Sequence, residues 1–286
     1  MGLPLLFFSI DGITETTMIS KYTTTEKSVG ETPLVALERL RTEQGLYPHI
    51  PLAYAGRLDP MASGKLLILI GDECKAQKKY HSLDKEYQVE ILLGVSSDSG
   101  DVLGLLSPVD HRSVTEFEVK KILKQFVGPI TLPYPHFSSK TVKGKPLHTW
   151  ALEKRLNEIE IPKKESTIHR LTYKGLKSLT KSEVLTTVRK KIETIPEVTD
   201  PQKALGANFR RDDVRASWNE FEKTGGDTYQ ILSFTCIASS GTYMRTLAEC
   251  IAKELGTVGL AYSIHRTSIG KYFPLINSFG FWIKKF

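Results

Sequence analysis

Asp59 is a carboxylate in a tight turn directly ahead of a strongly apolar run. It lies in the stretch AYAGRLDPMASGKLLILIGDECK, residues 53–75, among the turn-prone residues from Gly56 to Gly64, and the apolar residues 66–70 follow. An isolated Asp-Pro most often caps a turn. A carboxylate presented rigidly at the edge of a buried strand can also act as a nucleophile or a general base, so its partners decide between the two readings.

A reactive carboxylate in that place must be ionised, and burial beside a strand raises its pKa unless a cation compensates. Arginine suits this task, because it stays charged in any pocket and its planar fork matches a carboxylate. Arg57 lies two residues before Asp59 and is one candidate. Side chains two apart in a turn need not converge, so a partner from elsewhere in the chain is also considered.

The elements that would position these groups are helices and strands in irregular order. Helical patterns with capping residues and closing glycines cover residues 32–45, 115–128 and 244–256. Residues 87–93 alternate between apolar and polar types, which predicts a half-buried strand. This mixture predicts an α+β fold with a mixed or antiparallel central sheet.

The composition indicates a globular protein, because 40% of its 286 residues are hydrophobic. Its 39 Lys and Arg exceed its 32 Asp and Glu, which gives a net charge of +7 and favours a polyanionic partner. The cysteines, Cys74, Cys236 and Cys250, form no CxxC pair, so we expect neither disulfides nor zinc and a reducing, cytoplasmic location. The run at residues 3–10 is too short for a signal peptide, and no stretch approaches the roughly 18 apolar residues of a membrane helix.

Six stretches of the chain, in order, resemble the motifs of the TruB-type pseudouridine synthases. The stretch around Asp59 is similar to the family's G-H-T-G-T-L-D-P-x-A-x-G-x-L, whose aspartate is catalytic. Its GRLD also resembles the RluA and RsuA synthases, but the remaining motifs favour the TruB type. These are KSVGET (27–32), KEY with GVSSDSGDVLG (85–87 and 94–104), PYPHFSSKTVKGKPLHTWA (133–151), SSGTYMRTLAECIAKELG (239–256) and HRTSIG (265–270).

The resemblance implies a pseudouridine synthase fold, which is α+β with a mixed or antiparallel central sheet and flanking helices. It also implies that Asp59 is the catalytic residue and that Arg245 is its cation, in preference to Arg57. Tyr87 would stack on the target base and belongs to the catalytic group, and Tyr243 and Ile264 would line the same pocket.

The implied reaction turns uridine into its C-glycoside. The bond between C1′ and N1 breaks, the uracil rotates and C5 rejoins C1′, so the target nucleotide must be flipped out of its stack into a pocket. This isomerisation needs no cofactor. The sequence agrees, since it contains no Walker A motif, no GxGxxG after a strand and no metal-ligand spacing among its histidines.

Contacts to RNA are expected from two parts of the chain. Two residues near Asp59 replace a histidine and a threonine of the family pattern, and a lysine precedes the expected strand. A second group lies in the basic and aromatic stretch 133–151, where cations would meet phosphates and aromatic rings would meet splayed bases. The expected substrate contacts are Tyr54, Arg57, Lys85, Lys140, Lys143 and Lys145.

The resemblance predicts one catalytic domain over residues 1–286, without the PUA domain that many relatives append. The segment at about 174–227 is polar, mixed in charge and only weakly periodic, and is therefore the expected insertion. TruB-type enzymes that use no guide RNA usually act on the T-loop of tRNA. The expected substrate is therefore the uridine at position 55 of tRNA, and the sequence indicates no membrane contact and no obligatory protein partner.

Two alternatives remain. One is a synthase with a different RNA specificity, because Tyr54, Arg57 and the insertion lie where substrate choice could change. The other is an RNA-binding or RNA-folding module that has lost catalysis. The combination of Asp59, Tyr87 and Arg245 argues against that module, since a pure binder has no need of all three.

Overall fold

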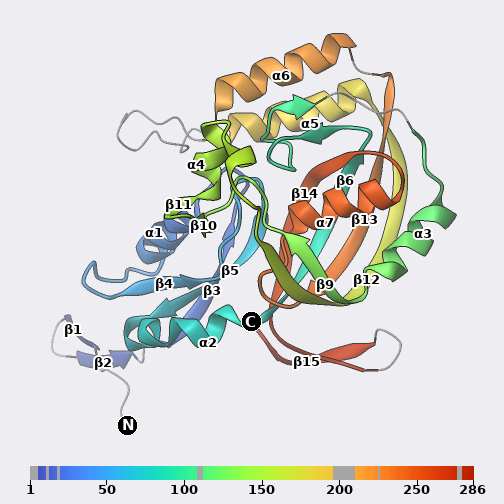
Figure 1. The fold of residues 1–286 in the computed structure, drawn as a ribbon. Helices are drawn as coiled ribbons and strands as arrows, with labels where there is room; N and C mark the ends of the chain where they lie inside the picture. The colour runs from blue at the N-terminus through green and yellow to red at the C-terminus, as the bar shows by residue number, and fades with distance from the viewer. Residues whose placement is uncertain are drawn as a thin grey trace.

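The computed structural model describes residues 6–10, 13–17, 20–107, 112–195, 210–224, 226–275 and 279–286. A mixed sheet forms the centre of the molecule, and helices lie beside it (Figure 1). Its strands are β3 (Tyr22–Lys27), β4 (Leu52–Ala55), β5 (Ser63–Ile70), β6 (Asp84–Leu93), β9 (Gly128–Pro133), β12 (Lys163–Thr180), β13 (Thr228–Ala238), β14 (Gly259–Pro274) and β15 (Gly280–Lys285).

The strand order of this sheet is β3-β5-β14-β6-β13-β12-β9, with β4 paired to β5 and β15 paired to β14. β14 and β5 run parallel, whereas the other neighbours in this order run antiparallel. Shorter strands form separate pairs. These are β1 (Leu6–Ile10) with β2 (Ile13–Thr17), β7 (Ser96–Ser97) with β8 (Leu106–Ser107), and β10 (Thr141–Val142) with β11 (Lys145–Pro146).

The helices are α1 (Pro33–Glu43), α2 (Gln77–His81), α3 (Glu116–Gln125), α4 (Leu147–Leu152), α5 (Lys181–Glu193), α6 (Arg211–Thr224) and α7 (Met244–Glu254), with short 3₁₀ turns at Gly71–Ala76 and Leu156–Glu158. α7 packs its apolar stripe on the sheet, and α5 and α6 lie side by side above it (Figure 1). The α+β fold with a mixed sheet and flanking helices, predicted from the sequence, is confirmed.

Local signals placed the helices correctly. Thr32 caps α1 by accepting a hydrogen bond from the Val35 amide at 3.2 Å. Thr115 and Glu118 form the expected capping box at the start of α3. The strand expected at residues 87–93 lies within β6.

The segment 174–227, predicted as an insertion, continues β12 and then supplies α5 and α6. Trp218 of α6 is fully buried and donates from Nε1 to the carbonyl oxygen of Val102 at 3.0 Å. The apolar side chains of both helices belong to the main core of the protein, so the described part of this segment is built into the domain. They are Val184, Leu185, Val188, Ile192, Val214, Trp218 and Phe221.

The aromatic end of the chain pairs with β14 through β15, and Trp282 packs against Tyr272 with ring centroids 5.3 Å apart. Phe281 and Ile283, on the same strand, are exposed. Within the described ranges, no helix is both long enough and apolar enough to cross a membrane.

Candidate active site

Asp59 lies on the loop between β4 and β5, and two buried cations hold that loop from inside the protein. Lys27 is 1% exposed and donates from Nζ to the carbonyl oxygens of Ser28, Pro60 and Ala62 at 2.8, 3.4 and 2.5 Å. Burial lowers the pKa of Lys27 to about 8. The loop therefore has a fixed floor, which is what a reactive side chain requires.

Arg266 holds the other side of the loop and is also 1% exposed. Its guanidinium donates to the carbonyl oxygens of Lys65, Arg57 and Gly56 at 2.7, 3.3 and 3.4 Å. Gly64 lets the backbone of Arg266 lie close to the loop. It has a φ of +110°, and a Cβ there would lie 2.3 Å from the carbonyl oxygen of Arg266. Only glycine fits at such a position.

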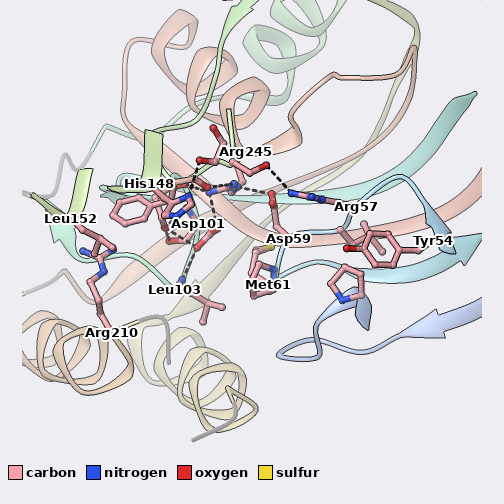
Figure 2. A pocket seen from close by; sticks show the side chains of 17 residues that line it. Tyr54, Arg57, Asp59, Met61, Asp101, Leu103, His148, Leu152, Arg210 and Arg245 are labelled. Carbon is pink, nitrogen blue, oxygen red and sulfur yellow. Dashed lines mark hydrogen bonds and ion pairs between the residues drawn. The ribbon is translucent and has the colours of Figure 1, made fainter. Parts of the chain in front are cut away.

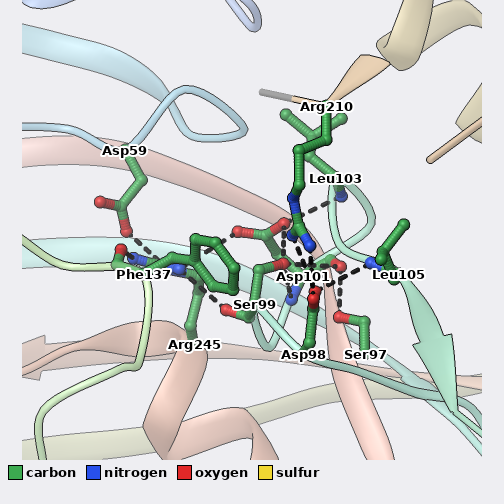
Figure 3. Close-up of polar contacts among 10 residues, drawn as sticks. All are labelled: Asp59, Ser97, Asp98, Ser99, Asp101, Leu103, Leu105, Phe137, Arg210 and Arg245. Carbon is green, nitrogen blue, oxygen red and sulfur yellow. Dashed lines mark hydrogen bonds and ion pairs between the residues drawn. The ribbon is translucent and has the colours of Figure 1, made fainter. Parts of the chain in front are cut away.

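Arg245, in the first turn of α7, is the cation that faces Asp59. Its Nε donates to Oδ2 of Asp59 at 2.8 Å, and the remaining donors reach the carbonyl oxygens of Ser99 at 2.8 Å and Phe137 at 3.1 Å (Figure 3). Arg245 is 3% exposed, whereas the Asp59 side chain is 35% exposed. In this pair the arginine is buried and the carboxylate is partly exposed to solvent. The partner of Asp59 in the structure is Arg245, the residue predicted from the sequence.

A second carboxylate, Asp101, lies on the opposite side of Arg245. Its Oδ2 is 3.6 Å from Nη1 of Arg245, and its Oδ1 accepts hydrogen bonds from the Ser99 hydroxyl and the Leu103 amide at 2.9 Å each (Figure 3). Burial raises the pKa of Asp101, and the charge of Arg245 opposes that rise. Burial also disfavours the charge on Arg245 itself, but Asp59 and Asp101 raise its pKa overall.

Glu249 adds a third acidic group near Arg245, four residues later on the same helix. Its carboxylate lies against Gly100, whose φ is +73° and where a Cβ would come within 3.0 Å of the Glu249 carboxyl. Burial raises the pKa of Glu249 to about 7.

A cavity of about 590 Å³ opens beside Asp59, and we call it the Tyr87 cavity. Tyr87 of β6, Tyr243 at the start of α7 and Ile264 of β14 line it, as predicted from the sequence. Burial raises the pKa of both tyrosine hydroxyls, so the two rings act there as neutral walls. Its size, its aromatic walls and its mixed polar and apolar lining suit a flat ligand that also makes polar contacts.

Tyr54, Arg57 and Lys85 also line the Tyr87 cavity. Arg57 is exposed and donates from Nη1 to the Ser139 hydroxyl at 2.9 Å, so it does not take the place of Arg245. Lys85 is 5% exposed and donates from Nζ to the carbonyl oxygens of His81 and Leu83. Burial, together with the charge of Arg266, lowers the pKa of Lys85 to about 8.

The lysines of the stretch 133–151 line neither this cavity nor the one described next. Lys143 donates to the Glu158 carbonyl oxygen at 3.1 Å, and Lys145 pairs with the Glu153 carboxylate at 2.7 Å. Lys140 lies over the Tyr134 ring, with Nζ 5.3 Å from the centroid. Their contact with RNA therefore stays a prediction.

A second cavity of about 540 Å³ adjoins the first at Asp59, and we call it the Phe137 cavity (Figure 2). Met61, Leu103, Phe137, His148, Leu152 and Arg210 line the part that the Tyr87 cavity does not share. Sequence reasoning left this cavity out, and it also gave no role to Lys27, Asp101 or Arg266. All three lie in the matched motifs, which were the available signal.

Within the described residues, no group of three or more histidine, cysteine, aspartate or glutamate side chains could hold a metal ion. The site instead combines an ionisable carboxylate, a buried arginine and an aromatic-walled cavity. Such a set can attack or deprotonate a planar ring compound that enters the cavity.

Comparisons with known proteins point to one family. The chain is 28% identical to "tRNA pseudouridine synthase B" of Caldicellulosiruptor saccharolyticus over 77% of this chain and 58% of the relative. It is 31% identical to "tRNA pseudouridine synthase 4" of Saccharomyces cerevisiae over 72% of this chain and 57% of the relative. The chain thus spans less than two thirds of the length of both relatives.

The fold matches a chain of a solved structure described as "Crystal Structure of a Cbf5-Nop10-Gar1 Complex". The TM-score is 0.50 at 15% identity, and the match covers 87% of this chain and 48% of the other. The family model described as "TruB family pseudouridylate synthase (N terminal domain)" matches residues 50–194, which is half of the chain. The chain belongs to the TruB family of pseudouridylate synthases.

Proposed function

We propose that this protein converts uridine to pseudouridine in RNA, with Asp59 as the catalytic residue. The observation that carries the proposal is the ion pair between Asp59 and Arg245, because the carboxylate of this pair lines the Tyr87 cavity. Arg245 holds the carboxylate of Asp59 in position, and Asp59 either attacks the nucleoside or removes a proton from it. Family membership supports this assignment of roles.

The target uridine enters the Tyr87 cavity after it leaves its stack, at a cost of a few kcal/mol. Tyr87 stacks on its uracil ring, and Tyr243 and Ile264 close the pocket around it. The cavity of about 590 Å³ leaves room for the base to rotate between bond cleavage and rejoining. The isomerisation neither adds nor removes atoms or electrons, so it requires no cofactor.

The substrate we propose is the T-loop uridine of tRNA, at position 55, because the two relatives are named as tRNA pseudouridine synthases. Tyr54, Arg57 and Lys85 line the Tyr87 cavity and would contact the target nucleotide there. Lys140, Lys143 and Lys145 would contact the RNA outside it. The unpaired thiols of Cys74, Cys236 and Cys250 fit a cytoplasmic location. We further propose a single catalytic domain that works without an obligatory protein partner, with residues 174–227 as its insertion.

A synthase of different RNA specificity is the second candidate. Arg210, from the proposed insertion, lines the Phe137 cavity next to Asp59, where it could alter substrate choice.

Tritium release from C5-labelled uridine in a tRNA transcript tests the proposal. We expect release by the wild type, and none by Asp59→Asn, which keeps the size of the side chain and still binds the RNA. Release from ribosomal RNA but not from tRNA would favour the second candidate. Binding of tRNA without release from either RNA would contradict the enzymatic function.

A further inference from the structure

Residues 97–106 form a loop between β6 and α3, and this loop carries two of the partners of Arg245. We call it the Asp101 loop. The carbonyl oxygen of Ser99 accepts from Nη1 of Arg245 at 2.8 Å, and the Asp101 carboxylate lies 3.6 Å from the same nitrogen (Figure 3). Arg245 in turn donates to Asp59 at 2.8 Å. The position of this loop therefore sets the position of the arginine, and through it that of the reactive carboxylate.

The Asp101 loop behaves as one unit, because Asp101 is hydrogen-bonded on both sides. The Ser97 hydroxyl donates to the carbonyl oxygen of Asp101 at 2.6 Å, and the Leu103 amide donates to its carboxylate at 2.9 Å. Asp101 is 5% exposed, and Val102 beside it is fully buried. A displacement of Val102 would therefore move the carboxylate that faces Arg245.

The helix α6 holds the Asp101 loop from outside by two hydrogen bonds. Trp218 is fully buried and donates from Nε1 to the carbonyl oxygen of Val102 at 3.0 Å, directly beside Asp101. The hydroxyl of Ser217, the preceding residue on the helix, accepts from the Leu106 amide at 2.9 Å. A buried carbonyl oxygen that loses its donor is costly, so the bond from Trp218 fixes the backbone of the loop at this point.

Two cations add to this hold. Arg210, directly ahead of α6, pairs with both carboxylate oxygens of Asp98 in the loop at 2.6 and 3.0 Å (Figure 3). On α5, Lys191 is half-buried, donates to the carbonyl oxygen of Tyr262 and lies over its ring, with Nζ 4.7 Å from the centroid. The amide of Ala261, the residue before it, donates to a carbonyl oxygen of the Asp101 loop at 2.9 Å.

We propose that the helix pair α5 and α6 is a brace that positions Arg245, and that Trp218 is its central positioning residue (Figure 1). Trp218 touches no reacting atom. It acts through Val102 and Asp101 on the arginine, and so on Asp59. This inference rests on the proposed function, and it gives the segment 174–227 a part in catalysis.

Trp218→Phe tests the brace, since it keeps most of the buried ring but removes the donor to Val102. Single-turnover tritium release from a T-arm stem-loop measures the rate. Fluorescence anisotropy in the Asp59→Asn background measures RNA affinity. We expect the rate to fall about tenfold, because small displacements of a reacting group cost at least that much, and the affinity to stay unchanged. A wild-type rate in folded Trp218→Phe would overturn the proposal.

The matched control for lost stability is Val184→Ala. Val184 is fully buried in the first turn of α5. Arg189 of α5 pairs with Glu222 of α6, so Val184 lies toward the end of the helix pair that is far from Trp218. This variant should unfold more easily than the wild type but keep its rate. An equal loss of rate in Val184→Ala would show that lost stability alone slows the reaction, and the brace would then be wrong.

A double-variant cycle tests the link through Arg245. If Trp218 acts through Arg245, Trp218→Phe combined with Arg245→Lys should be no slower than Arg245→Lys alone, because the geometry that it protects is already lost. Changes at independent sites have effects that multiply in rate. If the two losses multiply, Trp218 does not act through Arg245, and the proposal fails.

Two further measurements keep the outcome clear. Absence of tritium release by the wild type would contradict the proposed function, and the brace with it, whereas release combined with multiplying losses would contradict the brace alone. Thermal unfolding checks that each variant is folded at the assay temperature. Ser217→Ala, which removes only the acceptor of the Leu106 amide, replaces Trp218→Phe if that protein is unfolded, and the same result of the cycle is expected.

Discussion

The ammonium group of Lys27 lies 2.5 Å from the carbonyl oxygen of Ala62, inside the protein and beneath the loop that carries Asp59. Burying an ammonium group costs free energy, and this burial lowers the pKa of Lys27 to about 8. Its three carbonyl partners at residues 28, 60 and 62 indicate what it achieves, since they tie β3 to the loop between β4 and β5.

Replacing Lys27 by Met should lower kcat about 10- to 100-fold while the protein stays folded. The apolar side chain fills the space but releases the carbonyl oxygens, and small displacements of a reacting group cost about that much. Single-turnover tritium release measures the effect. The matched control is Lys75→Met, since Lys75 is an exposed lysine paired with Asp72. Equal activity of the two variants would refute the role assigned to Lys27.

Lys27 also predicts a dependence of stability on pH. Its folded pKa of about 8 is below its ordinary value of 10.5, so the unfolded chain binds more protons between those two values. The free energy of unfolding of the wild type should therefore rise with pH across this window and be insensitive to Lys27 below it. Urea unfolding of the wild type and Lys27→Met at several pH values measures this. From pH 8 to pH 10.5, the free energy of unfolding of the wild type should rise relative to that of Lys27→Met.

Arg245 should not be replaceable by lysine. Its three bonds, to Asp59 and to the carbonyl oxygens of Ser99 and Phe137, need a planar fork, which a point charge cannot reproduce. We expect Arg245→Lys to lose about 100-fold in kcat with little change in RNA affinity. Arg245→Met should lose all activity and about 3 kcal/mol of stability, since Asp101 then remains buried without a cation. Kinetics with urea unfolding of both variants check this, and wild-type kcat in Arg245→Lys would contradict it.

The ion pair itself shows what a sequence can and cannot predict. Asp59 and Arg245 are 186 residues apart, and no periodicity links them. Only the order of motifs indicated that they meet. By contrast, the ends of α1 and α3 followed from local chemistry, because caps act within a few residues.

Charged residues were harder to place, because composition counts charges but not their pairing. The basic stretch around Lys145 predicted an exposed RNA contact, yet Glu153 lies close enough to pair with that lysine. Lys27 and Asp101 carried no recognisable sign of burial, since their partners are backbone carbonyl oxygens and a distant arginine. The Phe137 cavity needs Arg210 from a segment without a matched motif, so it could be found only in three dimensions.

Glu249 predicts a second pH effect, of opposite sign. Its folded pKa of about 7 lies above the ordinary 4.5, so the folded protein holds a proton that the unfolded chain releases between these values. The contribution of Glu249 to stability should fall as pH rises from 4.5 to 7. Glu249→Gln removes this titration. Urea unfolding should show that the free energy of unfolding of Glu249→Gln rises relative to that of the wild type between pH 4.5 and pH 7. If the two free energies change in parallel with pH, Glu249 ionises normally.

Tyr87 offers a way to separate stacking from hydrogen bonding in the cavity. The ring is a wall of the Tyr87 cavity, and burial raises the pKa of its hydroxyl, so it stays neutral at physiological pH. Tyr87→Phe keeps the stacking surface and should bind the RNA stem-loop as the wild type does. Tyr87→Leu loses the flat surface and should bind about tenfold more weakly, as expected for one lost base stack. Fluorescence anisotropy in the Asp59→Asn background measures both. If leucine binds as well as phenylalanine, Tyr87 does not stack on the flipped base, and the uridine must lie elsewhere in the cleft.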